Sequence, residues 1–179
     1  MKVTATEHPD VLIVEPRVFE DTRGAFFEAY NQTTFTNLGL RNGFVQDNQS
    51  TSKKDVLRGL HYQIRQPQGK LIRVLRGEIF DVAVDCRRKS QSFRQVVCVR
   101  LSAENRKMLW IPAGFAHGFL VLSAQADVLY KTTDFYAPEH ERTLLWNDPA
   151  LSIPWPAAQP ILSVKDQQGL PLSKAELYE

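Results

Sequence analysis

The chain has 179 residues, of which 43% are hydrophobic and 23% are charged, proportions that are ordinary for a globular protein. Its formal net charge of +2 is too small, and its basic residues are too scattered, to indicate a nucleic-acid partner. No apolar run approaches the length of a membrane span, so we expect no membrane association. The length of the chain favours one domain over residues 1–179.

The N-terminal run MKVTATEHPDV lacks the apolar core of a signal peptide, so we expect a cytoplasmic protein. The two cysteines, Cys86 and Cys98, lie in apolar or strand-like runs. We therefore expect buried thiols in a reducing compartment rather than a disulfide.

Strand signals dominate the first part of the chain. Short runs rich in β-branched and aromatic residues predict strands at Val11–Phe19, Ala25–Tyr30, Phe44–Ser50 and Val56–Gln63. Between them, Asn31–Leu40 begins at a capping residue and ends near a glycine, which predicts a helix.

The segment Gly69–Arg87 reads as two strands around a turn at Arg76-Gly77-Glu78. In the second strand, one face carries Phe80, Val82 and Val84, and the other carries Asp81, Ala83 and Asp85. This period of two is the pattern of a half-buried strand.

The remaining strands are predicted at Phe93–Ser102, Lys107–Pro112, His117–Ser123 and Asp127–Tyr136. The proline-rich stretch Asn147–Pro160 cannot be regular structure throughout, and it predicts a strap anchored by Trp146 and Trp155. The tail Ser173–Glu179 has a weak helical pattern. Many short strands with few helices favour an all-β sandwich or barrel.

Two of the four histidines raise the question of a metal site. Pro112-x-Gly-x-x-His117 resembles the second motif of cupins, which are jelly-roll barrels that often hold a metal. Where that family's first motif supplies a second histidine and then an acidic ligand, this chain has Gln63 and Lys70. A lysine ammonium has no lone pair for a metal, so we expect no metal ligands.

A lysine inside such a barrel could instead stabilise developing negative charge, which would leave His61 free to move protons. Taken singly, each candidate has a plain structural explanation. His61 could be a hydrogen-bonded strand residue, Lys70 a solvated hairpin residue and Tyr130 part of the core. Arg23 and Arg58 could be surface charges.

Taken together, seven motifs occur in one order along nearly the whole chain: VLIVEPRVFEDTRGAFFEAYN, FVQDNQS, VLRGLHYQ, QGKLIRVLRGEIFDVAVDCR, LSAENRKMLWIPAGFAHGFLVLS, LYKTTDFYAPEHERTLLWNDPAL and IPWP…PILSVKD. The chain thereby resembles the dTDP-4-dehydrorhamnose 3,5-epimerase family. The resemblance implies a cupin-type jelly-roll barrel with a few short peripheral helices, no metal and no cofactor.

The resemblance also implies an activity, which is epimerisation at C3 and C5 of dTDP-4-dehydro-6-deoxy-D-glucose in dTDP-L-rhamnose biosynthesis. It assigns the proton acceptor to His61, the proton donor to Tyr130, the cation near the keto oxygen to Lys70 and the partner carboxylate of the histidine to Asp166. A related enzyme that epimerises only C5 or only C3 shares these residues and stays an alternative.

The family's nucleotide-sugar contacts map onto positions spread along the chain: Arg23, Glu28, Gln46, Asp47, Asn48, Arg58, His117, Glu141 and Lys165. The resemblance further implies a homodimer in which an N-terminal segment reaches the partner subunit. Arg23 and Glu28 would then serve the partner's site.

Overall fold

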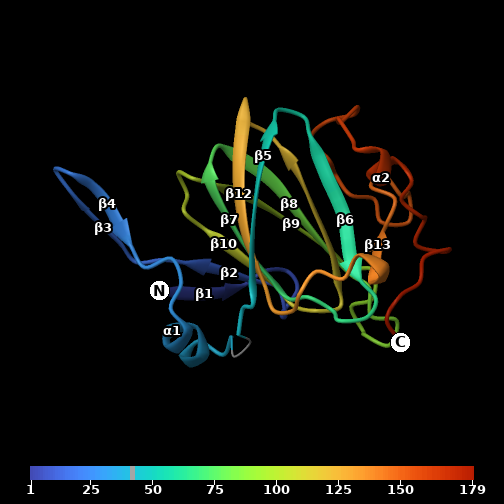
Figure 1. Cartoon of the computed structure of the whole chain (residues 1–179), viewed down its shortest axis with the longest axis horizontal. Helices are drawn as coiled ribbons and strands as arrows, with labels where there is room; N and C mark the ends of the chain where they lie inside the picture. Colours follow the sequence, from blue (N-terminus) through green and yellow to red (C-terminus); the bar gives the residue numbers. More distant parts are fainter. Residues whose placement is uncertain (41–42) are drawn as a thin grey trace.

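Two antiparallel sheets face each other across the protein (Figure 1). The structure is a computed structural model and describes residues 1–40 and 43–179. The 6-stranded sheet contains, in spatial order, β1 (Lys2–Ala5), β2 (Leu12–Glu15), β10 (Met108–Ile111), β7 (Lys70–Arg76), β12 (Gln125–Thr132) and β5 (Gln46–Lys53). The 5-stranded sheet contains β13 (Glu141–Thr143), β6 (Leu57–Gln63), β11 (Phe115–Val121), β8 (Glu78–Asp85) and β9 (Val96–Ser102). The all-β prediction is confirmed.

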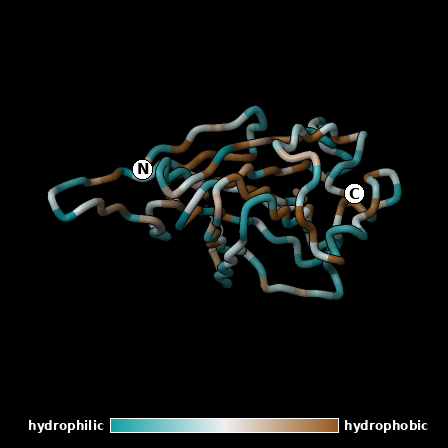
Figure 2. The backbone as a smooth tube through the Cα atoms, turned by 90° about the horizontal axis from the view of Figure 1, so that it is seen from above, coloured by the Kyte–Doolittle hydropathy of each residue, from teal (hydrophilic) through white to brown (hydrophobic). Residues whose placement is uncertain are grey.

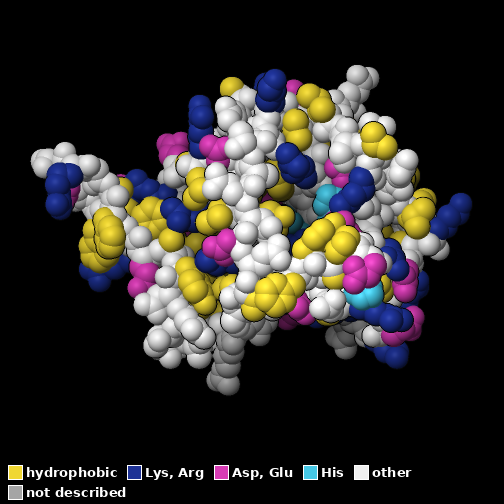
Figure 3. Space-filling model, viewed as in Figure 1, with side chains coloured by type: hydrophobic (Ala, Val, Ile, Leu, Met, Phe, Trp, Pro, Cys, Tyr) yellow, Lys and Arg dark blue, Asp and Glu magenta, His cyan; other side chains and the backbone are white. Residues whose placement is uncertain are grey.

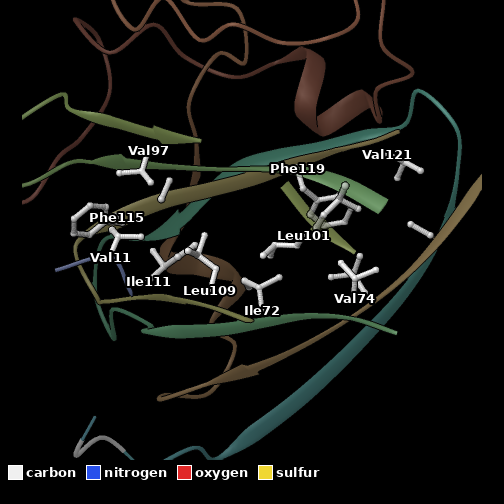
Figure 4. Packing of buried hydrophobic residues seen from close by; sticks show 14 residues of the cluster. Val11, Ile72, Val74, Val97, Leu101, Leu109, Ile111, Phe115, Phe119 and Val121 are labelled. Carbon is white, nitrogen blue, oxygen red and sulfur yellow. The ribbon is translucent and has the colours of Figure 1, made fainter. Parts of the chain in front are cut away.

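The space between the two sheets holds the main hydrophobic core (Figure 4). The 6-stranded sheet contributes side chains such as Ile72 and Leu109, and the 5-stranded sheet contributes Leu101 and Phe119. All four are at most 4% exposed. Apolar side chains alternate along each strand, so each sheet has an apolar inner face. Packing these two faces against each other buries them.

Each sheet also has a covered outer face. The C-terminal segment lies over the 5-stranded sheet, where Leu151, Leu172 and Leu177 pack against Val82 and Val84. On the 6-stranded sheet, Phe35 of helix α1 (Gln32–Asn37) packs in a separate cluster with Trp110. The strap over Asn147–Pro160 has the predicted lack of regular structure, and Trp155 Nε1 donates to Trp146 O at 2.7 Å.

A two-stranded hairpin, β3 (Val18–Asp21) and β4 (Gly24–Phe27), projects from the body (Figures 1 and 2). Hydrophobic side chains gather on it (Figure 3), and Phe19 and Phe26 are 52% and 73% exposed. Side chains of this size rarely stay in water unless another surface covers them. The hairpin therefore presents an exposed apolar surface in the single chain.

The structure corrects several element boundaries. The strand predicted at Val11–Phe19 is broken after Glu15 by Pro16, and its halves β2 and β3 join different sheets. The tail Ser173–Glu179 is not helical, since its side chains are held individually: Ala175 and Leu177 pack in the outer cluster and the Tyr178 hydroxyl donates to Gln63 O at 2.5 Å.

Some elements were not predicted at all. They are too short for a periodic pattern: β1, β13, the 3-10 turn Pro138–His140 and helix α2 (Val164–Gln167). In contrast, helix α1 is confirmed, with Asn31 as its N-cap residue and Asn31 Oδ1 accepting from Thr34 N.

Strand β8 is buried on both faces, which corrects the prediction of a half-buried strand. Val82 and Val84 face the outer cluster under the C-terminal segment, while Asp81 and Asp85 are both 0% exposed. The polar face of this strand therefore points into the protein, where its carboxylates require partners.

Both cysteine thiols are free. Burial raises the pKa of Cys86 to about 12 and that of Cys98 to about 11, which disfavours the reactive thiolate. Within residues 1–40 and 43–179, no helix has the length and apolar character needed to cross a membrane.

The packing between the sheets predicts a stability difference between two leucines. Leu101→Ala removes a fully buried side chain from the inter-sheet core, and it should lower the free energy of unfolding by about 2–5 kcal/mol. Leu75→Ala, at a position that is 38% exposed, is the control and should cost less than about 1 kcal/mol. Urea denaturation measures both, and equal losses would contradict this assignment of the core.

Candidate active site

A cavity of about 380 Å³ opens between the two sheets. This volume lies in the range of small-molecule sites. Its lining comes from both sheets and from the C-terminal segment: Gln46, Asn48, Ser50, Arg58, His61, Tyr62, Gln63, Gln68, Lys70, His117, Phe119, Tyr130, Tyr136, Glu141, Ser163, Lys165 and Asp166. The cavity thus gathers all four predicted catalytic residues.

Two glycines bring the histidine strands together. A Cβ on Gly59 would lie 2.5 Å from Gly118 Cα, so β6 and β11 approach more closely there than other residues allow. The pairing is irregular between His117 and Phe119, and His117 lies directly opposite His61. This local packing places two imidazoles side by side on the 5-stranded sheet.

His61 is paired with a carboxylate that comes from far along the chain. His61 Nε2 lies 2.5 Å from Asp166 Oδ1, although 105 residues separate them in sequence. Burial raises the pKa of Asp166, but the hydrogen bond with His61 and further bonds outweigh it, so its pKa is lowered and it is ionised. An ionised carboxylate only accepts, which puts the proton on Nε2 and the lone pair on Nδ1.

The protonation state of His61 suits a base. Burial lowers its pKa more than the hydrogen bond with Asp166 raises it, and the charges of Lys165 and Lys70 lower it further. Neutral imidazole is therefore favoured near neutral pH.

Lys70 begins β7 and is 8% exposed. Its Nζ donates to the backbone carbonyl of His61 at 3.3 Å, which holds the ammonium beside that residue. Burial lowers the pKa of Lys70 to about 8, while the negative charges of Glu141 and Asp81 oppose that shift. The cavity therefore contains a poorly solvated cation.

A second histidine–carboxylate pair lies deeper in the barrel. His117 Nε2 is 3.0 Å from both oxygens of Asp81, whose side chain is fully buried on the inward face of β8. The pair fixes the ring of His117 and gives the buried Asp81 carboxylate a hydrogen-bond partner. Asp81 also supplies one of the negative charges near Lys70.

Tyr130 faces the cavity from β12, in the sheet opposite His61. Burial raises its pKa, so the phenol keeps its proton. Arg58 enters from β6, and Ser52 Oγ accepts a hydrogen bond from its Nε at 2.9 Å. The cavity thus has a phenol on one side and a guanidinium fork beside it.

Three side chains, from the connection after β12, from β13 and from α2, are linked beside the cavity. Glu141 accepts from the Tyr136 hydroxyl at 2.8 Å and pairs with Lys165 Nζ at 2.7 Å. Tyr136 N in turn donates to Gln46 Oε1, and the Tyr136 ring remains 52% exposed. Through its two contacts, Glu141 holds the aromatic ring of Tyr136 and the ammonium of Lys165 together at the site.

Gln63 is turned to the backbone. Its Nε2 donates to Gln66 O and Phe135 O, and its Oε1 accepts from Ala137 N. The amide therefore clips two loops together. Over the described part of the chain, no group of three or more His, Cys, Asp or Glu side chains is arranged to hold a metal ion.

Three predicted contact residues lie outside this cavity. Arg23 sits on the projecting hairpin, where it pairs with Asp21 at 2.6 Å. Glu28 accepts from Asn31 and Thr34 at the start of α1. Asp47 points outward from β5 and pairs with Lys131 at 2.8 Å. The single chain therefore does not bring these three to the predicted catalytic residues.

Two residues of the cavity lining, Ser50 and Ser163, and one residue behind the lining, Asp81, were missed from sequence. Ser50 continues the inward alternation of Gln46 and Asn48, and its buried Oγ has no hydrogen-bond partner among the described residues. Asp81 stood out only as an acid within an apolar strand. The S-x-x-D spacing of a helix cap could have revealed Ser163.

Comparison with known proteins agrees with this geometry. The sequence model of a family described as dTDP-4-dehydrorhamnose 3,5-epimerase matches residues 5–174. A dTDP-4-dehydrorhamnose 3,5-epimerase of Pseudomonas aeruginosa is 60% identical over 180 residues, covering 99% of each chain. One of Salmonella typhimurium is 57% identical over 182 residues and 100% of each chain.

A solved structure is also similar. It is a dTDP-6-deoxy-D-glucose-3,5-epimerase of Legionella pneumophila in complex with dTDP-4-keto-L-rhamnose, with a TM-score of 0.95 and 49% identity. The match covers 98% of this chain and 94% of that one, and it confirms the predicted cupin-type fold. The chain belongs to the dTDP-4-dehydrorhamnose 3,5-epimerase family.

Proposed function

We propose that the cavity epimerises C3 and C5 of a dTDP-linked 4-keto-6-deoxyhexose, with His61 as the base, Tyr130 as the acid and Lys70 as the stabilising cation. The observation that carries this proposal is the placement of a carboxylate-paired imidazole and a neutral phenol on opposite sheets of one cavity. The high full-length identity to 3,5-epimerases favours action at both carbons over action at one.

The reaction begins with removal of a proton from carbon. The C4 carbonyl acidifies the hydrogens on C3 and C5, but the resulting enolate is still high in energy. Neutral His61 accepts the proton at Nδ1, while Asp166 holds Nε2–H and stabilises the imidazolium that forms.

The enolate oxygen then needs a positive partner. Lys70 is fixed beside His61 and has few competing waters, so its charge acts strongly on an oxyanion in the cavity. Removing a preorganised donor of this kind typically raises the barrier by about 3–4 kcal/mol. No metal is needed for this step.

Inversion requires that the new proton arrive on the other face of the carbon. Tyr130 lies on the 6-stranded sheet and His61 on the 5-stranded sheet, so a sugar ring between them has an acid on one face and a base on the other. A buried phenol with a raised pKa is protonated and can donate.

The nucleotide part requires cations and an aromatic face. Arg58 and Lys165 supply positive charge at the cavity, which His117 also lines, and arginine binds phosphate through two parallel hydrogen bonds. The exposed ring of Tyr136 offers a stacking surface for thymine.

The same proposal includes a homodimer. Arg23 and the exposed Phe26 lie on the projecting hairpin, where a second copy of the chain would cover the apolar surface and receive Arg23 in its own site. We also assign the enzyme to the cytoplasm, where its unreactive thiols stay reduced.

Deuterium incorporation tests the roles of the base and acid. After EDTA treatment, the protein should incorporate deuterium from D₂O at C3 and C5 of dTDP-4-dehydro-6-deoxyglucose, as read by NMR of the product. His61→Ala should abolish exchange because no base remains. Tyr130→Phe should keep some exchange but lose inversion, and normal exchange in His61→Ala would rule out this base.

Lys70 predicts an alkaline limit on activity. Because its folded-state pKa is about 8, the ammonium loses its proton as the pH rises through that value, and kcat/KM should fall. Lys70→Arg keeps a charge at higher pH and should remove this fall even if its maximum rate is lower. Lys70→Met is the control and should be slow at every pH. A parent and an arginine variant that decline at the same pH would show that another group sets the limit.

Subunit mixing tests whether Arg23 acts in the partner's site. Arg23→Ala and His61→Ala should each be impaired as pure proteins. After unfolding and refolding a 1:1 mixture, about a quarter of the sites should contain both intact residues if Arg23 acts across the dimer. If Arg23 acts within its own chain, the mixture should stay as impaired as its components.

A further inference from the structure

A serine hydroxyl stands behind the His61–Asp166 pair. Ser163 is the N-cap residue of α2, and its Oγ accepts from Asp166 N at 3.1 Å. The same hydroxyl donates to Asp166 Oδ2 at 2.7 Å, while Oδ1 faces His61. Each carboxylate oxygen has its own partner, so the group cannot rotate without losing both hydrogen bonds.

Helix α2 cannot fix this carboxylate by packing alone. It has only four residues, Asp166 is the buried one, and Val164 is 71% exposed. A single helical turn is not stable by itself in water. The orientation of the Asp166 side chain therefore depends on local hydrogen bonds.

The backbone on the far side of α2 is anchored separately. Leu170 N donates to Thr143 O at 2.9 Å, and Leu145 N donates to Leu170 O at 2.8 Å. These bonds hold the chain beside β13, four residues beyond Asp166. They position the segment but do not set the side-chain torsions of the carboxylate.

We propose that Ser163 is a positioning residue for the catalytic base, because its hydroxyl holds the Asp166 carboxylate against His61. The role in catalysis rests on the proposed function, whereas the geometric role does not. Ser163 would not touch the reacting carbon; it acts through Asp166 on the tautomer and orientation of the imidazole.

The proposal has a consequence for the titration of His61. Four charged groups act on this imidazole or respond to its charge: Asp166 and Lys165 from α2, Lys70 from β7 and Glu141 from β13. Burial lowers the pKa of His61, and the Asp166 hydrogen bond opposes that effect. A carboxylate that turns away would therefore let the pKa of His61 fall further.

Three substitutions separate the hydroxyl from the helix cap. Ser163→Gly removes the hydroxyl but keeps most of the capping propensity, Ser163→Ala removes both, and Ser163→Thr keeps both. Ser102→Ala is the matched control, because Ser102 Oγ accepts from Asn105 N with the same three-residue spacing and lies outside the cavity lining.

Two readouts are measured on each full-length variant. NMR titration of His61, assigned with His61→Ala, should show a lower pKa in the glycine and alanine variants. Deuterium exchange into the sugar nucleotide should be at least about tenfold slower in both, the scale on which activity falls when a hydrogen-bonding group behind a metal-ligating histidine is lost. The threonine variant and Ser102→Ala should match the parent in both readouts.

An unchanged or raised His61 pKa in Ser163→Gly would overturn the proposal, because the carboxylate would then hold its place unaided. So would exchange within about twofold of an active parent. If the parent itself fails to exchange, the proposed function is wrong, and the titration still decides the role of Ser163.

Discussion

The hydrogen bond between His61 and Asp166 joins two parts of the protein that lie 105 residues apart in the sequence. His61 belongs to β6, which lies between β13 and β11 in the 5-stranded sheet, and Asp166 belongs to a single turn of helix in the C-terminal segment. That segment packs over the outer face of the sheet through its leucines. Its hydrophobic contacts therefore place the Asp166 carboxylate at the edge of the cavity, and the His61–Asp166 pair depends on this packing.

Three acidic side chains inside the barrel each have a hydrogen-bonding or ionic partner. Asp81 pairs with His117, Asp166 with His61, and Glu141 with Lys165. Isolated ions at this depth would be very costly, whereas paired ones are tolerated. Lys70 differs, because it donates to a carbonyl and has only longer-range negative charges nearby. Its shifted pKa reflects that weaker compensation, and it leaves positive charge available for an oxyanion.

Long alternating strands and the site motifs could be predicted from sequence, because side-chain period and turn residues act locally. The break at Pro16 was missed, because the separate sheets of β2 and β3 are set by partners that lie elsewhere in the chain. The inward face of β8 was misjudged because Asp81 and Asp85 look like solvent-facing residues until their partners are known. The four-residue helix that carries Asp166 has no periodicity to detect, and its position comes from tertiary contacts. Family motifs identified Asp166 where local pattern could not.

The inward-facing polar residues also divide the barrel into two unequal halves. One half is filled by tightly packed aliphatic and aromatic side chains, and the other surrounds an open cavity, where the Ser50 hydroxyl has no hydrogen-bond partner among the described residues. The half with the cavity has less dispersion and hydrophobic stabilisation to hold the sheets together. A bound nucleotide sugar would fill this cavity and pack against both sheets. Because such a ligand binds only the folded enzyme, the free energy of unfolding would rise with the cellular concentration of the ligand.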